Sequence, residues 1–209
     1  MRRQAVPSLA GKVFVVDDDK SFLRSMDRLL RTAGYEVRTF ISAREFLAAD
    51  RGDGQSCLLL DLRMPGVSGI DLQEQLVASG YDIPIVFLSG HAEFRSGVRA
   101  MKAGAIDFLA KPFTETELLA AIGKALERDL RSRAGRAAKQ EVLAKLARLT
   151  PREREVCDLV ATGLLNKQIA AELGAAEKTI KCHRGRVMEK LEVGSVAELV
   201  RLVDLARKP

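Results

Sequence analysis

Short apolar runs alternate with amphipathic stretches over residues 11–126. Five runs are apolar or alternate with a period of two, which is typical of β-strands: residues 12–16, 36–40, 57–60, 83–88 and 106–109. Each run is followed by apolar residues at helical spacing. These helical patterns cover residues 21–33, 68–78, 92–103 and 114–126, and a further one begins at the capping box Ser42–Glu45. Regular alternation of strands and helices predicts an α/β domain with a doubly wound, five-stranded parallel sheet.

The pattern changes after residue 126. Residues 127–149 contain no proline and favour a helical linker, with a thin apolar stripe interrupted at Gly135. This stripe leaves two interpretations open, a short coiled coil in a dimer or a lone, partly frayed helix, and the glycine favours the second. Residues 1–10 have no apolar pattern, and we expect a disordered lead-in there.

Residues 150–209 show four short helical patterns. Thr150 with Glu153 forms a capping box for the first, and Asn166 is expected to cap the second. The third spans about Glu177–Leu191, with its basic side chains facing outward, and Ser195 opens the fourth. Four short helices with a glycine turn between the second and third predict an all-α helix-turn-helix domain.

Polar side chains stand where the strands of the first domain end. Asp17 and Asp18 follow the first strand, Asp61 the third, Ser89 the fourth, and Lys111 comes shortly after the fifth. Because ligands bind outside the carboxyl ends of parallel strands, these groups are expected to meet. Carboxylates in one place repel unless a cation binds, and oxygen ligands suit Mg²⁺. A solvated loop or a turn explains any one residue alone, but the set suits phosphoryl transfer to Asp61.

Composition adds a charge asymmetry to this picture. The 209 residues are 47% hydrophobic and 30% charged, with no apolar run long enough to cross a membrane and no export signal. Three cysteines without metal-ligand spacing suggest free thiols in a reducing cytoplasm. The whole net charge of +6 falls in residues 127–209. A basic C-terminal module indicates a polyanionic partner, unless it is only a solvated surface.

The motifs VVDDD, LLLDLRMPGVSG, VFLSGH and DFLAKPF resemble the receiver domain of two-component response regulators. The resemblance implies that Asp61 is the phosphorylation site. It also implies that Mg²⁺ is held by Asp17, Asp18, Asp61 and the backbone carbonyl of Arg63. Ser89 and Phe108 would form the switch pair, and Lys111 would pair with the phosphate, before a cis bond to Pro112.

The switch in such receivers reshapes the face formed by residues 92–103 and 106–109. We therefore expect Val98, Lys102 and Leu109 to be dimer contacts, although ordinary core packing explains Val98 and Leu109 equally well. His91 stands two residues past Ser89, where a side chain can gate the hydrolytic water, but an exposed loop histidine is usually only polar.

The motifs LTPREREV, GLLNKQIAAELG and KTIKCHRGRVMEKL resemble the LuxR/FixJ-type DNA-binding domain, so nearly the whole chain resembles a FixJ/NarL-family response regulator. The resemblance implies a recognition helix at Glu177–Leu191 and a dimer interface in the last helix. Side chains expected at bases are Lys178, Lys181 and Cys182. Those expected at phosphates are Lys167, Thr179, Arg184 and Lys190, with Arg186 on the same outward face.

Three residues depart from that family pattern. Ala176 stands where a serine cap is common, and Gly185 removes a side chain from the recognition helix. Cys182 replaces an aliphatic residue, which suits contact with a thymine methyl group better than a redox role, since no partner cysteine is apparent.

These features predict a regulator that accepts a phosphoryl group from a sensor histidine kinase, forms a homodimer and binds double-stranded promoter DNA. RNA polymerase is a further expected partner. A phosphatase with an aspartyl-phosphate intermediate is the enzymatic alternative, but Arg63 occupies the place of its second aspartate. A DNA-binding regulator with a silent receiver is the third hypothesis.

Overall fold

The computed structural model describes residues 11–90 and 94–207, with the side chains of 94–96 excepted, and divides the chain into two compact units. The first unit ends at Arg133 and the second begins at Ala134. The expected disordered lead-in, residues 1–10, lies outside the described residues. Within the described part of the chain, no helix is both long enough and apolar enough to span a bilayer.

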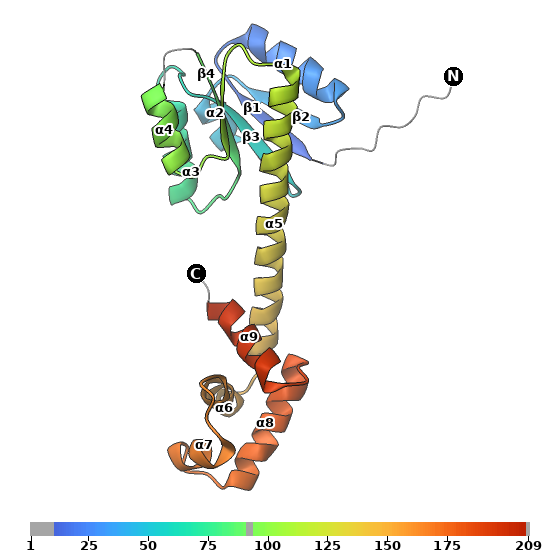
Figure 1. Cartoon of the computed structure of the whole chain (residues 1–209), viewed down its shortest axis with the longest axis vertical. Helices are drawn as coiled ribbons and strands as arrows, with labels where there is room; N and C mark the ends of the chain where they lie inside the picture. The colour runs from blue at the N-terminus through green and yellow to red at the C-terminus, as the bar shows by residue number, and fades with distance from the viewer. Residues whose placement is uncertain (1–10, 91–93, 208–209) are drawn as a thin grey trace, which may run out of the picture. The chain divides into compact units, whose positions relative to one another are not determined.

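The first unit is built on a parallel sheet with strand order β2-β1-β3-β4-β5 (Figure 1). Its strands are β1 (Lys12–Val16), β2 (Glu36–Phe40), β3 (Ser56–Asp61), β4 (Ile85–Ser89) and β5 (Asp107–Ala110). Its helices are α1 (Lys20–Thr32), α2 (Ala43–Ala48), α3 (Gly69–Ala78), α4 (Phe94–Lys102) and the first part of α5 (Glu115–Ala147). The predicted doubly wound sheet is therefore confirmed.

Two apolar layers cover the two faces of the sheet. One packs α2, α3 and α4 against side chains such as Leu58, Leu60 and Phe87. The other packs α1 and α5 against Leu59 and Leu88. Neighbouring residues of β3 thus enter opposite layers, which is why its consecutive leucines are all buried.

The second unit is helical, with α6 (Pro151–Ala161), α7 (Asn166–Glu172), α8 (Glu177–Leu191) and α9 (Val196–Arg207). Their apolar faces share one core that contains Val156, Ile169, Ile180, Val187 and Leu199. The predicted capping box at the start of α6 is present. The predicted cap at Asn166 is wrong: Leu165 is the N-cap of α7, and its backbone N–H donates to Gln168 Oε1.

The expected linker is helical, as predicted, but it is not interrupted. A single helix, α5, runs from Glu115 to Ala147 without a break at residue 127 or at Gly135. A glycine inside a helix lowers helix stability by about 1 kcal/mol relative to alanine. The neighbouring turns of α5 compensate for this loss, so the helix continues through Gly135. One residue near each end of the expected linker is buried: Asp129 in the first unit, and Leu146 in the core of the second.

Candidate functional site: an acidic sheet edge and a basic helix

Two buried carboxylates and one lysine meet at the carboxyl ends of β1, β3 and β5. Lys111 Nζ lies 2.6 Å from Asp17 Oδ2 and 2.6 Å from Asp61 Oδ1. Asp17 is 1% exposed and Asp61 is 8% exposed. The sequence predicted that these three residues would meet, and the parallel register brings them together from positions far apart in the chain.

Charge balance at this edge is incomplete, because one ammonium serves two carboxylates. Burial raises the pKa of Asp61 above its usual value, and the hydrogen bond and charge of Lys111 oppose this rise. Burial lowers the pKa of Lys111, but its bonds to Asp17 and Asp61 outweigh burial, so the net pKa is raised. The second oxygen of Asp61 accepts the backbone N–H of Arg63 at 2.8 Å. The site therefore holds excess negative charge that a further cation would relieve.

The donor chemistry of the edge fits Mg²⁺. Asp17 and Asp61 offer carboxylate oxygens, the neighbouring Asp18 is exposed, and Mg²⁺ prefers one or two carboxylates with retained waters. Asp19 has another task, because its side chain accepts the backbone N–H groups of Ser21 and Phe22 and caps α1. Among the described residues, no three carboxylate, imidazole or thiol groups are already clustered as a complete metal site.

The expected switch residues lie beside this edge. Ser89 ends β4, is 1% exposed, and its hydroxyl donates to the carbonyl of Gly90 at 3.1 Å. Phe108 lies on β5 next to Phe87 of β4 in the sheet register. The bond between Lys111 and Pro112 is cis, as the resemblance implied. His91 lies outside the described residues.

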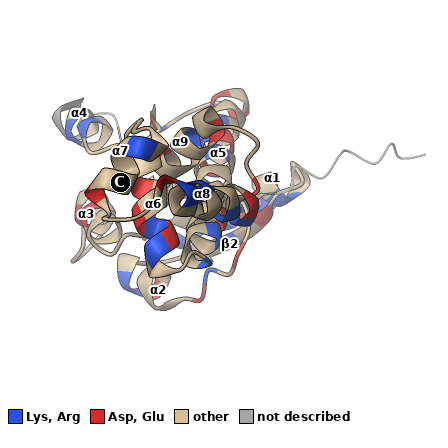
Figure 2. Cartoon of the chain, turned by 90° about the horizontal axis from the view of Figure 1, so that it is seen from below, with Lys and Arg blue, Asp and Glu red and all other residues tan. Residues whose placement is uncertain are grey.

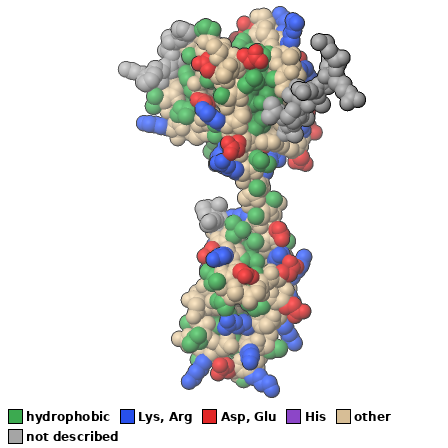
Figure 3. All heavy atoms as spheres, turned by 45° about the vertical axis from the view of Figure 1, so that its right-hand side comes forward, with side chains coloured by type: hydrophobic (Ala, Val, Ile, Leu, Met, Phe, Trp, Pro, Cys, Tyr) green, Lys and Arg blue, Asp and Glu red, His purple; other side chains and the backbone are tan. Residues whose placement is uncertain are grey.

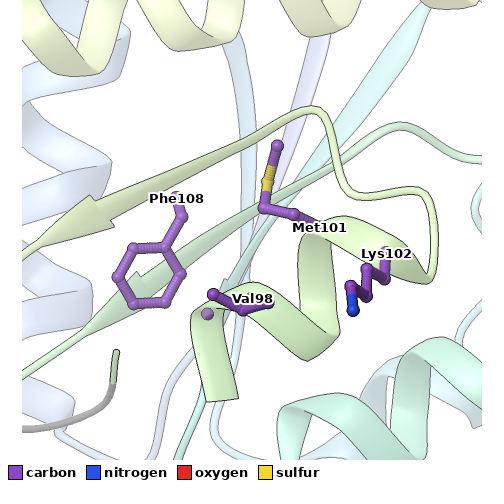
Figure 4. A pocket seen from close by; sticks show the side chains of 5 residues that line it. Val98, Met101, Lys102 and Phe108 are labelled. Atoms are coloured by element: carbon purple, nitrogen blue, oxygen red, sulfur yellow. The ribbon is translucent and has the colours of Figure 1, made fainter. Parts of the chain in front are cut away.

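A cavity of about 480 Å³ opens between α4 and β5 (Figure 4). It is lined by Gly97, Val98, Met101, Lys102 and Phe108. Val98 and Met101 are about two-fifths exposed, so this apolar surface is largely uncovered in the single chain. The sequence pattern missed Met101, which lies between two expected contacts at helical spacing.

Leu109 does not share that surface. It packs into the layer formed by α1 and α5, whereas Phe108 packs into the opposite layer. Because successive side chains of a strand point to opposite faces, Leu109 cannot join Val98 and Lys102. The expectation that all three lie on one dimer face is therefore corrected for Leu109.

The second unit carries Lys and Arg residues on α7 and α8 (Figure 2). Residues exposed there as expected are Lys167, Lys178, Thr179, Lys181, Cys182 and Arg186. On the face shown in Figure 3, Lys and Arg side chains gather at the end of this unit where Figure 1 places α7 and the start of α8. Ala176 gives α8 no side-chain cap, as predicted.

Two expected phosphate contacts are already bonded within the unit. Lys190 Nζ lies 2.6 Å from Glu153 Oε2, whose residue is 3% exposed, and also donates to the carbonyl of Arg148. Lys190 thus fastens α8 to the start of α6, and we do not propose it as a phosphate contact. Arg184 is half-buried and donates to Asn166 Oδ1 at 3.0 Å, so it orients α7 against α8.

Comparison with known proteins assigns a family to each unit. Residues 13–123 match the family described as response regulator receiver domain, and residues 147–203 match the bacterial regulatory proteins of the luxR family. Nodulation protein W of Bradyrhizobium diazoefficiens is 50% identical over 192 residues, covering 92% of this chain and 85% of the relative.

Two solved structures extend the likeness over both units. The response regulator StyR has a TM-score of 0.81 at 50% identity, covering 93% of this chain and 98% of that one. Full-length FixJ from B. japonicum has a TM-score of 0.58 at 39% identity, covering 94% and 97%. The chain therefore belongs to the response regulators that join a receiver domain to a LuxR-type DNA-binding domain, which are phosphorylation-dependent DNA-binding transcription regulators.

Proposed function

We propose that Asp61 is the residue that accepts the phosphoryl group, from a phosphohistidine of a cognate sensor kinase. The observation that carries this proposal is the convergence of Asp61, Asp17 and Lys111 at the carboxyl edge of the sheet. An Asp61 oxygen attacks phosphorus, the bond from phosphorus to the histidine nitrogen breaks, and its electron pair stays on the imidazole.

Mg²⁺ bound by Asp17, Asp18, Asp61 and the carbonyl of Arg63 would supply positive charge for the phosphoryl oxygens. Lys111 then holds one phosphoryl oxygen through its ammonium, at the place where it now bonds Asp61. The Ser89 hydroxyl turns from the Gly90 carbonyl to another oxygen, and Phe108 follows into the space that Ser89 leaves.

We further propose that this change promotes a homodimer through the uncovered surface of α4 at Val98, Met101 and Lys102. Dimers then place two α8 helices in successive major grooves of promoter DNA, with Lys178, Lys181 and Cys182 near bases. Lys167, Thr179 and Arg186 contact phosphates, and a bound dimer is positioned to meet RNA polymerase. The DNA target places this activity in the bacterial cytoplasm.

Radiolabelled acetyl phosphate with Mg²⁺ tests the acceptor directly. Wild type should gain a label that hydroxylamine releases, as an acyl phosphate does, and Asp61→Asn should gain none. Asp53→Asn, which changes an exposed aspartate of the same domain, should label like wild type. Equal labelling of wild type and Asp61→Asn would refute the assignment and favour a silent receiver.

A further inference from the structure

The segment of α5 just beyond the matched receiver domain carries a buried charge. Asp129 is 0% exposed, although the sequence around it, Glu127 to Arg133, is almost entirely polar. The receiver match ends at residue 123, so this aspartate belongs to neither matched domain. Burying a carboxylate costs free energy unless it is paired and hydrogen-bonded. The bonding partners of Asp129 therefore show which segments of the chain it joins.

Asp129 joins α5 to the amino end of the central strand. Its Oδ2 accepts the backbone N–H of Ser56, the first residue of β3, at 2.8 Å. The same oxygen lies 2.6 Å from Arg133 Nε, one helical turn later. β3 carries Asp61 at its other end, so the acceptor strand is fastened at its start to the helix that continues toward the DNA-binding unit.

Two further bonds act on the same few turns of α5. Gln55 Nε2 donates to the carbonyl of Leu126 at 2.8 Å, and the Ser132 hydroxyl donates to Asp82 in the segment before β4. Together with the Asp129 bonds they form a clasp, which we define as Gln55, Ser56, Asp82, Asp129, Ser132 and Arg133. The compact first unit ends directly after its last member, Arg133.

We infer that Asp129 is a positioning residue that fixes the direction in which α5 leaves the receiver, and thereby sets the spacing of DNA half-sites that a dimer prefers. This inference rests on the proposed function, because it requires receivers that dimerise and two DNA-binding units that bind together. The bonds of the clasp are distributed over two turns of α5, and the bond from the Ser56 N–H to Asp129 is buried, which is what a fixed helix exit needs.

The physical consequence is a narrower set of positions for the second DNA-binding unit. When the first unit of a dimer is bound, the second binds at an effective concentration set by the connector between them. A connector that starts at residue 134 restricts the positions of the second DNA-binding unit more than a connector that starts near residue 126. Loss of the clasp therefore broadens the spacing that is tolerated, while contacts to a single half-site stay unchanged.

The test uses the full chain with Mg²⁺ and beryllofluoride, a phosphoryl mimic, and protein in this state is called loaded. The DNA is a duplex that loaded wild type selects from random sequences. Affinity is measured on the selected duplex, on versions with altered spacing between half-sites, and on a single half-site. For Asp129→Asn, we expect the ratio of the affinities for the duplexes with the best and the worst spacing to fall by roughly threefold or more. Dimerisation and single-half-site affinity should match wild type.

Glu127→Gln is the matched control. It removes a carboxylate two residues away that pairs with Arg131 on the exposed side of the same helix. This variant should keep the wild-type spacing profile. An unchanged profile in Asp129→Asn would overturn the inference, because a purely structural role for the buried charge would then suffice.

An alanine inserted between Arg133 and Ala134 tests the inference even if Asp129→Asn fails to fold, since it leaves the clasp intact. One added residue turns the following helix by about 100° relative to a fixed start. We expect the insertion to shift the preferred spacing or weaken binding at the original one, and an unchanged preference would overturn the inference. If loaded wild type neither dimerises nor selects a duplex, the proposed function itself fails.

Discussion

Replacing Lys111 by methionine removes the one ammonium that the structure places between Asp17 and Asp61. Two buried carboxylates then face each other without a bonded cation, and Mg²⁺ becomes the group that relieves them. We therefore expect Lys111→Met to lower the stability of the receiver unit, and Mg²⁺ to restore more stability in this variant than in wild type.

The size of the effect follows from burial. Removing one partner of a fully buried ion pair costs about 3–5 kcal/mol. The Lys111 side chain is 25% exposed, so water retains part of its solvation, and the loss in free energy of unfolding should be about 2–3 kcal/mol. In a urea titration this corresponds to a midpoint roughly 1–2 M lower.

The chain offers a selective signal for this measurement. It has no tryptophan and two tyrosines, Tyr35 and Tyr81, and both lie in the first unit. Tyrosine fluorescence or near-ultraviolet circular dichroism thus follows receiver unfolding without interference from the DNA-binding unit, with either a chelator or Mg²⁺ present.

Lys124→Met is the control, because Lys124 pairs with Asp107 on the surface and its side chain is 65% exposed. Its loss should cost less than about 1 kcal/mol and show no added dependence on Mg²⁺. If Lys111→Met and Lys124→Met had the same midpoint, or if Mg²⁺ stabilised Lys111→Met no more than wild type, the electrostatic account of the edge would be wrong.

Three further predictions concern other parts of the chain. In Gly69→Ala, the added Cβ would clash with the Asp61 carbonyl oxygen, so we expect the free energy of unfolding in urea to fall by about 1–3 kcal/mol and dimerisation with beryllofluoride to weaken. The bond to Lys190, with the hydrogen bonds from Thr150, lowers the pKa of Glu153 to about 2, so the stability from these bonds is present above pH 4.5 and lost as pH falls through about 2. Glu153→Gln should therefore lower the melting temperature of the second unit at pH 7 but not near pH 2, by far-ultraviolet circular dichroism, and equal differences at both pH values would contradict this. Lys181→Ala should weaken binding to the selected duplex more than binding to a random duplex, since Lys181 is placed at bases, and equal losses on both duplexes would contradict this placement.

The sheet and its edge were predictable because their signals are local. Apolar runs bounded by turns identify strands such as β3, and parallel topology then brings the ends of all strands to one edge, so Asp17, Asp61 and Lys111 follow without any knowledge of contacts. It was harder to predict which face of the sheet each side chain of a strand points to. Phe108 and Leu109 are both apolar on an edge strand, and only packing decides which layer each one enters.

The sequence is least informative where a polar residue has a distant partner. Asp129 and Lys190 both lie in charged helical stretches, and nothing local indicates that they bond Ser56 and Glu153, which are far away in the sequence. Gly135 reads locally as a break, but helix continuity depends on the turns around it and on packing at both ends. Asn166 is a good cap by type, although Arg184 takes its side-chain oxygen.

The most direct test of the account is the affinity of the full chain for its selected duplex with Mg²⁺, before and after beryllofluoride, in wild type and Asp61→Asn. Wild type should bind more tightly after beryllofluoride is added, with the stoichiometry of a dimer, and Asp61→Asn should not respond. Equal affinity of wild type in both conditions, or an equal gain in Asp61→Asn, would contradict the claim that the state of Asp61 controls DNA binding.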